Sequence, residues 1–181
     1  MIKTIEEKIR ECRACHLYNP DPIFKPLPGS GVSDSKFLIV GVAPSIKRKE
    51  MPEVDNSNPL TEDSRYTSSW LNKILKEINW PLDKTYITNF IKCTLPNNRE
   101  PTEGDTKTCI KLHFDQEVYV LVPQVIICLG NIVYNSLIDR EELQRFSFEK
   151  VYHYAYIARK PSEYSIWKEQ WINLKEKYNI K

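Results

Sequence analysis

The sequence predicts an α/β fold, a three-layer α/β/α sandwich with a central four-stranded parallel sheet. Short and almost wholly apolar runs at 37–42 and 125–129 are typical of strands that are buried on both faces. Segments with helical spacing of apolar residues alternate with such runs along the chain. This alternation favours parallel strands joined by helices that cover both faces of the sheet. We expect residues 1–181 to form a single domain.

Apolar or aromatic character marks the segments that are expected to form the strands, at 37–42, 85–90, 125–129 and 151–157, the last of them as a strand or the end of one. In parallel sheets, ligands bind beyond the carboxyl ends of the strands. A site is therefore expected among the turn at 41–45, the segment that starts at Asn89 and the segment around His153.

Helices are expected between and around these strands, at 4–11, 68–79, 102–120, 131–138 and 163–178. Ser68 or Ser69 is a suitable N-cap for the second helix. In the last helix four apolar residues are expected to face the core: Ile166, Trp167, Trp171 and Leu174. The stretch 46–66 is polar and lacks an apolar period, and a loop of this length in a compact domain is often functional.

The charge balance and the apolar runs of the chain limit the classes of protein to which it can belong. The chain has 26 Lys and Arg against 24 Asp and Glu, so its overall charge does not require a nucleic-acid partner, and any such contact must come from local patches. No apolar run approaches the ~20 residues of a membrane span. The first twelve residues resemble an amphipathic helix rather than a signal peptide, because they lack an apolar core. We therefore expect an intracellular, cytoplasmic protein.

Four cysteines form the most informative pattern: a C-x-x-C pair, Cys12 and Cys15, and two distant partners, Cys93 and Cys109. Thiolates are the ligands that Zn²⁺ and iron–sulfur clusters select. In a reducing compartment such cysteines indicate a metal site or buried thiols rather than disulfides. The fifth, Cys128, lies in an apolar strand and is expected to be a buried small hydrophobe.

Seven sequence blocks occur in the order that one family shows: CRACHL at 12–17, PLPGSG at 26–31, FLIVGVAPS at 37–45, YITNFIKC at 86–93, LPNNREPT at 95–102, the segment 123–130 and YHYAYIARKPS at 152–162. Together they resemble the iron–sulfur uracil-DNA glycosylases, families 4 and 5 of that superfamily. The resemblance implies an enzyme of base excision repair, associated with the nucleoid. Such an enzyme hydrolyses the N-glycosidic bond of uracil, or a related deaminated base, in DNA.

The resemblance also implies the metal. In the family the matching cysteines hold a [4Fe–4S] cluster, so Cys12, Cys15, Cys93 and Cys109 are expected to hold one here. Zn²⁺ at the same four sulfurs is the alternative. The implied role of the cluster is structural, because it would fasten the N-terminal helix to the Cys93–Cys109 region near the DNA.

The resemblance assigns the base-binding residues. Asn89 matches the asparagine that reads the uracil edge, where an amide both donates and accepts; alternatively it only caps the following turn. His153 matches a histidine that donates a hydrogen bond to the uracil oxygen where negative charge develops; alternatively it is a packed or surface histidine. Gly41 and Ala43 of the GVAPS turn are expected to face the base through their backbone.

The chain departs from the family at the water-activating position. Family 4 has an acidic residue where Val42 stands, and the apolar residue there is closer to family 5. Asp63, in the segment PLTED, is then the expected catalytic acid, with Glu62 as the substitute; alternatively both are charges of a solvated loop. Leu60 stands where an aromatic stacks on the flipped base, and Tyr66 of the same loop is expected to replace it.

Further residues are expected at the DNA. Tyr154 replaces a proline in the loop that enters the base stack, and a tyrosine can still act as a wedge. Phosphate contacts are expected from four cationic side chains: Lys47, Arg48, Arg99 and Arg159. Two other functions stay open. One is a catalytically inactive iron–sulfur module that binds DNA or a replication or repair protein, and the other is a zinc-stapled α/β protein unrelated to DNA.

Overall fold

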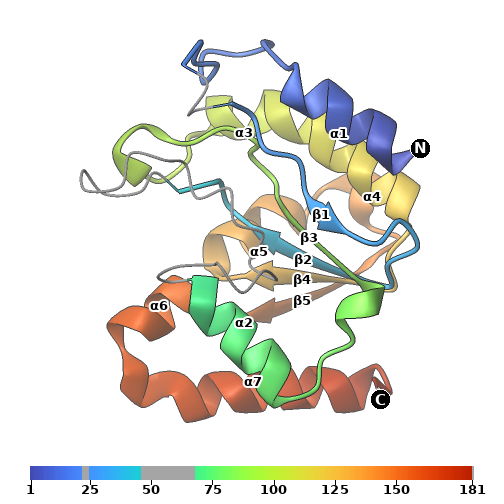
Figure 1. The fold of residues 1–181 in the computed structure, drawn as a ribbon, viewed down its shortest axis with the longest axis vertical. Coiled ribbons are helices and arrows are strands. Elements are labelled where there is room, and N and C mark those ends of the chain that lie inside the picture. The colour runs from blue at the N-terminus through green and yellow to red at the C-terminus, as the bar shows by residue number, and fades with distance from the viewer. Residues whose placement is uncertain (22–24, 46–67, 181) are drawn as a thin grey trace.

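The computed structural model describes residues 1–21, 25–45 and 68–180. These residues form one sheet in the order β1-β3-β2-β4-β5 (Figure 1), with strands β1 (Ser30–Gly31), β2 (Phe37–Gly41), β3 (Thr85–Asn89), β4 (Val125–Leu129) and β5 (Ser147–Val151). The predicted parallel sheet is confirmed, because β3, β2, β4 and β5 pair in parallel. The predicted strand number was wrong by one. The edge strand β1 pairs antiparallel with β3, and its two residues have no strand pattern of their own.

The helices of the described residues are α1 (Ile2–Arg10), α2 (Ser68–Glu77), α3 (Glu103–Cys109), α4 (Asp115–Leu121), α5 (Asn131–Leu137), α6 (Tyr154–Arg159) and α7 (Tyr164–Lys177). A π-helical turn at Ile110–Phe114 joins α3 to α4. Thr102 starts α3 through a capping box with Asp105, which agrees with the helix start predicted there. No helix in the described part of the chain has the length and apolar character to cross a bilayer.

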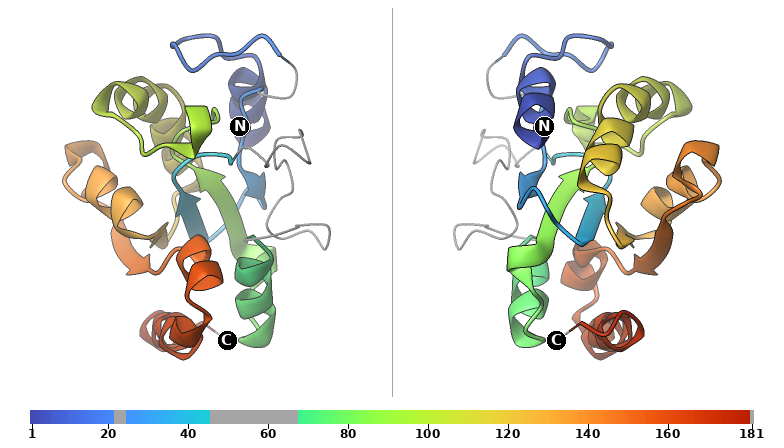
Figure 2. Two further views of the ribbon diagram at one scale, coloured as in Figure 1. Left: turned by 90° about the vertical axis from the view of Figure 1, so that its left-hand side faces the viewer. Right: turned by 90° about the vertical axis from the view of Figure 1, so that its right-hand side faces the viewer.

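Helices cover both faces of the sheet, as Figures 1 and 2 show. Successive side chains of a strand point to opposite faces, so β2 supplies two cores. Leu38 and Val40 pack in the core shared with α1, α4 and α5. Phe37 and Ile39 pack in the other core, with α2, α6 and α7. The three-layer sandwich is therefore confirmed.

The fourth predicted strand was misplaced. The structure has β5 at Ser147–Val151, and most of the segment predicted as strand at 151–157 is helix α6. Its alternating aromatic residues resemble a strand pattern, but the side chain of His153 caps a helix start. In α7, Trp167, Trp171 and Leu174 are buried as predicted, whereas Ile166 is 49% exposed. Ile166 lies about 100° around the helix from Trp167 and so turns away from the core.

Candidate active site

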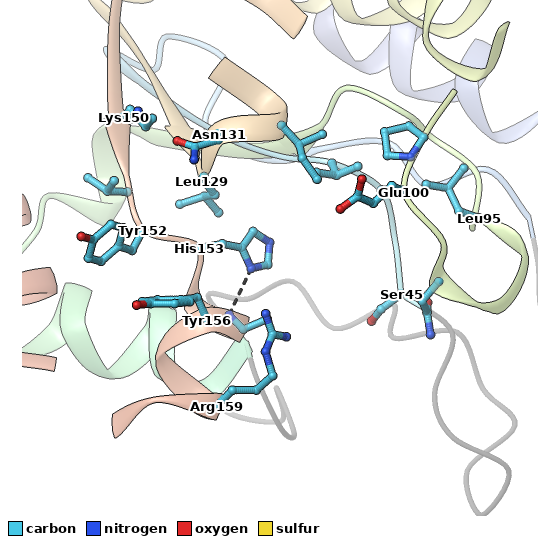
Figure 3. Close-up of a pocket in the computed structure, with 18 of the residues that line it drawn as sticks. Ser45, Leu95, Glu100, Leu129, Asn131, Lys150, Tyr152, His153, Tyr156 and Arg159 are labelled. Atoms are coloured by element: carbon cyan, nitrogen blue, oxygen red, sulfur yellow. Dashed lines mark hydrogen bonds between the residues drawn. The ribbon is translucent and has the colours of Figure 1, made fainter. Parts of the chain in front are cut away.

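A cavity of about 620 Å³ opens at the carboxyl edge of the sheet. Its walls come from the turn after β2, the loop before α3, the start of α5 and the segment between β5 and α6. Figure 3 shows His153 between these walls, with Ser45 and Glu100 across the cavity from Tyr152 and Tyr156. The cavity thus lies where the topology of a parallel sheet places ligands.

His153 is the N-cap of α6, and this role fixes its tautomer. Its Nδ1 accepts a hydrogen bond of 3.0 Å from the backbone N–H of Ala155 (Figure 3, dashed). An accepting Nδ1 carries no proton, so in the neutral ring the proton is on Nε2. The histidine of this cavity therefore offers one N–H donor.

The electrostatic surroundings keep His153 neutral. Burial foremost, together with the positive charge of Arg159, lowers the pKa of its imidazole to about 4. A lowered pKa leaves the ring uncharged at neutral pH, with its Nε2–H able to donate to an oxygen that gains negative charge.

Two glycines allow close packing around the site. Gly130 precedes α5 with a positive φ of 88°, which L side chains rarely adopt, and a Cβ there would lie 3.4 Å from Cβ of His153. At Gly41 a Cβ would lie only 2.4 Å from Oδ1 of Asn89. The side chain of Asn89 therefore lies directly over Gly41, its register partner in β2.

The structure brings together some of the predicted site residues. His153, Ala43, Arg99 and Arg159 line the cavity. Asn89 and Gly41 lie at the same edge of the sheet, but they are adjacent to the cavity rather than part of its lining. Six residues of the predictions lie outside the described residues: Lys47, Arg48, Leu60, Glu62, Asp63 and Tyr66.

Arg99 is held by Asp105 through two hydrogen bonds, of 2.6 and 3.0 Å. The carboxylate of Asp105 also accepts from the backbone and hydroxyl of Thr102 and contacts His16 at 2.9 Å. These partners, Arg99 foremost, hold the pKa of Asp105 well below its usual range. Arg99 is thus a preoriented cation at the cavity wall, with part of its charge already balanced.

The four cysteines of the predicted metal site gather beside α1 and α3. Cys12 and Cys15 follow α1 and are half-buried, whereas Cys93 and Cys109 are buried. Burial foremost, together with electrostatic interaction with the other three cysteines, raises the pKa of the Cys93 thiol to about 12. Without a cation this thiol stays protonated at neutral pH, and binding of a metal centre would displace its proton. As they stand, no three or more Cys, His, Asp or Glu side chains of the described residues are arranged to hold a metal ion.

The family follows from comparison with known proteins. A model of the "Uracil DNA glycosylase superfamily" matches residues 28–176, which is most of the chain. This chain belongs to the uracil-DNA glycosylase superfamily.

Relatives within this superfamily are named type-4 uracil-DNA glycosylases. Those of Sulfurisphaera tokodaii and Archaeoglobus fulgidus are both 28% identical to this chain, over 71% and 81% of its length. That of Saccharolobus solfataricus is 26% identical over 81%. The matches span 54%, 68% and 63% of the respective relatives, so the chain corresponds to only part of each.

The comparisons favour family 4, although Val42 by itself is closer to family 5. In the structure Val42 lines the cavity but offers no group that could orient water. Tyr154, the predicted wedge, is partly buried against the core and contacts the His153 ring, with 4.2 Å between ring centroids, and its role at DNA stays a prediction. The exposed tyrosine of this segment is its neighbour Tyr152.

Several residues that line this cavity were not predicted from the sequence: Glu100, Asn131, Lys150, Tyr152, Tyr156 and Gln170. One available signal was the topology rule that already selected His153, since Asn131 follows the carboxyl end of β4 directly. Gln170 had no such signal. It lies in α7, far along the chain, and its side-chain amide oxygen accepts a hydrogen bond of 2.8 Å from the backbone N–H of Tyr152.

Proposed function

We propose that this chain is a uracil-DNA glycosylase, which hydrolyses the N-glycosidic bond of uracil or a related deaminated base in DNA. The observation that carries the proposal is the neutral His153, whose Nε2–H is available at the cavity while Nδ1 is engaged by Ala155. Superfamily membership and the names of the relatives support it. Activity on DNA would place the protein at the nucleoid.

The proposed reaction needs three contributions at the extruded base. Asn89 reads the uracil edge, because its amide can both donate and accept. His153 donates to the oxygen that becomes negative as the bond to the sugar breaks. The peptide groups of Gly41 and Ala43 border the base from the turn after β2.

The proposed substrate is single- or double-stranded DNA. Arg99 and Arg159 both line the cavity, and Arg159 is exposed. A guanidinium pairs well with phosphate, so each is proposed to contact the backbone near the extruded nucleotide. Lys47 and Arg48 are proposed to add phosphate contacts.

We assign the activation of water to Asp63. The Glu100→Gln variant is the control for the Asp63→Asn variant. Glu100 is the acidic side chain among the described lining residues. We expect Asp63→Asn to slow uracil release by about 100-fold, because a positioned general base contributes at least that factor. Glu100→Gln is expected to stay close to the wild-type rate. Single-turnover kinetics on both variants decides the matter, and the opposite pattern would transfer the role to Glu100.

A [4Fe–4S] cluster is proposed at Cys12, Cys15, Cys93 and Cys109. The donor set fits, because thiolates are the ligands that iron–sulfur clusters select, and Cys93 and Cys109 lie close enough to Cys12 and Cys15 to interact with them electrostatically. One Zn²⁺ would need all four sulfurs within about 2.3 Å of a single point. Zn²⁺ at the same four sulfurs is the alternative, and iron, sulfide and zinc analysis of the purified protein separates the two. When bound, the cluster would join α1 to the Cys93–Cys109 region.

Release of uracil from a labelled oligonucleotide tests the function. We expect the purified protein, with its iron content confirmed, to convert uracil-containing DNA to abasic DNA. An oligonucleotide with thymine in place of uracil is the control, and it should stay intact. Tight DNA binding without release from either strand form would refute the proposal in favour of the inactive module. In that case replication or repair proteins become the partners to seek.

A further inference from the structure

Lys92 lies almost completely inside the protein, with only 1% of its surface exposed. Its ammonium has three N–H groups, and each has an acceptor. They donate to Glu117 Oε2 at 2.5 Å, to Thr88 Oγ1 at 2.7 Å and to the backbone carbonyl of Asn89 at 2.7 Å. Lysine is rarely buried unless it is paired and hydrogen-bonded in this way.

Glu117 is the buried partner of this ammonium, and it ties together three parts of the fold. Its carboxylate accepts from the Thr88 hydroxyl at 3.1 Å and from the backbone N–H of Gly29 at 3.3 Å. Glu117 itself belongs to α4, which packs against α1. The pair thus joins helix α4, the end of β3 and the loop before β1.

The backbone of Lys92 reaches a different partner set. Its N–H donates to Sγ of Cys109 at 3.2 Å, and its carbonyl accepts from Leu27 at 2.8 Å. The next residue is Cys93. Lys92 therefore contacts a proposed cluster ligand through its backbone and the Asn89 peptide through its side chain.

The contact to Asn89 bears on base reading. The Asn89 carbonyl belongs to the peptide that leaves β3, so holding it fixes the backbone orientation from which the Asn89 side chain projects over Gly41. A displacement of about 1 Å in a positioning group can slow catalysis by about 100-fold.

We propose that Lys92, held by Glu117, is a positioning residue that fixes Asn89 for base reading. This inference rests on the proposed function, in which Asn89 recognises the base. A buried ion pair contributes little to stability compared with an apolar pair of similar size. Stability alone therefore does not account for this buried pair. Its contacts with Cys109 and with the Asn89 peptide are consistent with a positioning role.

The test replaces both charges, because removing one would leave the other buried and unpaired. Lys92→Met/Glu117→Gln removes the ammonium and the carboxylate, and the amide oxygen introduced at position 117 can still accept from Gly29. We expect iron content and absorbance near 400 nm to stay at the wild-type level. Affinity for uracil-containing DNA should fall about 10-fold and kcat/KM about 10- to 100-fold. Affinity for abasic DNA, which has no base to read, should be unchanged.

A second ion pair of the same helix supplies the control. Asp115, two residues before Glu117, pairs with Arg140 at 2.7 Å and is largely buried, away from the cavity. Arg140→Met/Asp115→Asn should leave the rate and both DNA affinities unchanged. If the Lys92→Met/Glu117→Gln variant does not fold, Thr88→Val replaces it. That isosteric change keeps both charges but removes one acceptor of Lys92, and the same selective loss is expected at about 3- to 10-fold.

The outcomes separate this inference from the proposed function. If wild-type protein releases uracil and the Lys92 variant keeps both its rate and its preference for uracil-containing over abasic DNA, the inference is overturned. If wild-type protein releases no uracil, the proposed function fails. The inference is then decided by hydrogen exchange of the backbone at 88–91, where faster exchange in the Lys92 variant than in the Arg140 variant supports it and equal exchange refutes it.

Discussion

Replacing His153 by alanine is expected to slow uracil release by about 100- to 1,000-fold. Loss of a single donor to a developing oxyanion has an effect of that size. The ring is neutral and its Nε2 carries the proton, because Nδ1 accepts from Ala155 and burial lowers the pKa to about 4. The loss should therefore appear in kcat, where transition-state stabilisation acts. Single-turnover kinetics on a uracil-containing oligonucleotide measures it.

Two further variants sharpen this prediction. His153→Gln retains an N–H donor and should recover part of the rate. His16→Ala removes a histidine that contacts Asp105 and lies outside the lining of the cavity, so it should stay near the wild-type rate. A His153→Ala variant as fast as the His16→Ala variant would refute the assignment.

The pH dependence of His153 has a defined sign. Its pKa in the folded state lies below the ordinary value of 6.5. On acidification the unfolded chain binds the proton first, so the contribution of His153 to stability is complete above about pH 6.5 and is lost as pH falls towards 4. In the folded protein the imidazole of His153 should stay neutral between pH 6.5 and about 4, so uracil release should show no histidine step in that range. A pH–rate profile with a histidine step near 6.5 that disappears in His153→Gln would contradict this.

Replacing Cys93 by serine is expected to abolish the cluster and to lower the thermal midpoint by about 10–20 °C. Binding of a structural metal centre is also folding free energy, and a loss of about 5 kcal/mol corresponds to that shift in a chain of this size. Cys93 is chosen because its thiol is buried and interacts electrostatically with all three of the other cysteines. Iron and sulfide analysis, absorbance near 400 nm and a melting curve measure the effects.

Cys128→Ala is the matched control for the metal. Cys128 is fully buried in β4, as predicted, and its thiol is a small hydrophobe of the core. Its replacement should leave iron content unchanged with only a small loss of stability. Zinc instead of iron in the wild-type protein would contradict the cluster. Unchanged iron content in Cys93→Ser would contradict the assignment of that ligand.

Local patterns explain the parts of the fold that the sequence predicted well. The continuous apolar runs of β2 and β4 predict strands that are buried on both faces, and Thr102 with Asp105 marks a helix start. The errors came from segments where local pattern and tertiary contact disagree. Tyr152 to Tyr156 alternate like a strand, yet the hydrogen bond from Ala155 to His153 makes a helix there. The edge strand β1 exists only because β3 offers it a partner.

The scaffold could be inferred from the chain alone: the parallel sheet, the four cysteines and the position of His153 at the carboxyl edge of the sheet. Each of these features is predicted by residues that lie close together in the chain or by motifs whose order is typical of the family. Three features become visible only in the folded protein: which imidazole nitrogen of His153 carries the proton, the hold of Asp105 on Arg99, and the pairing of Glu117 with Lys92. Glu117 lies in a charged stretch that suggests a solvated helix face, yet its carboxylate has no exposure. Its partners are 25 to 88 residues away, and contacts over such separations leave no local pattern in a sequence.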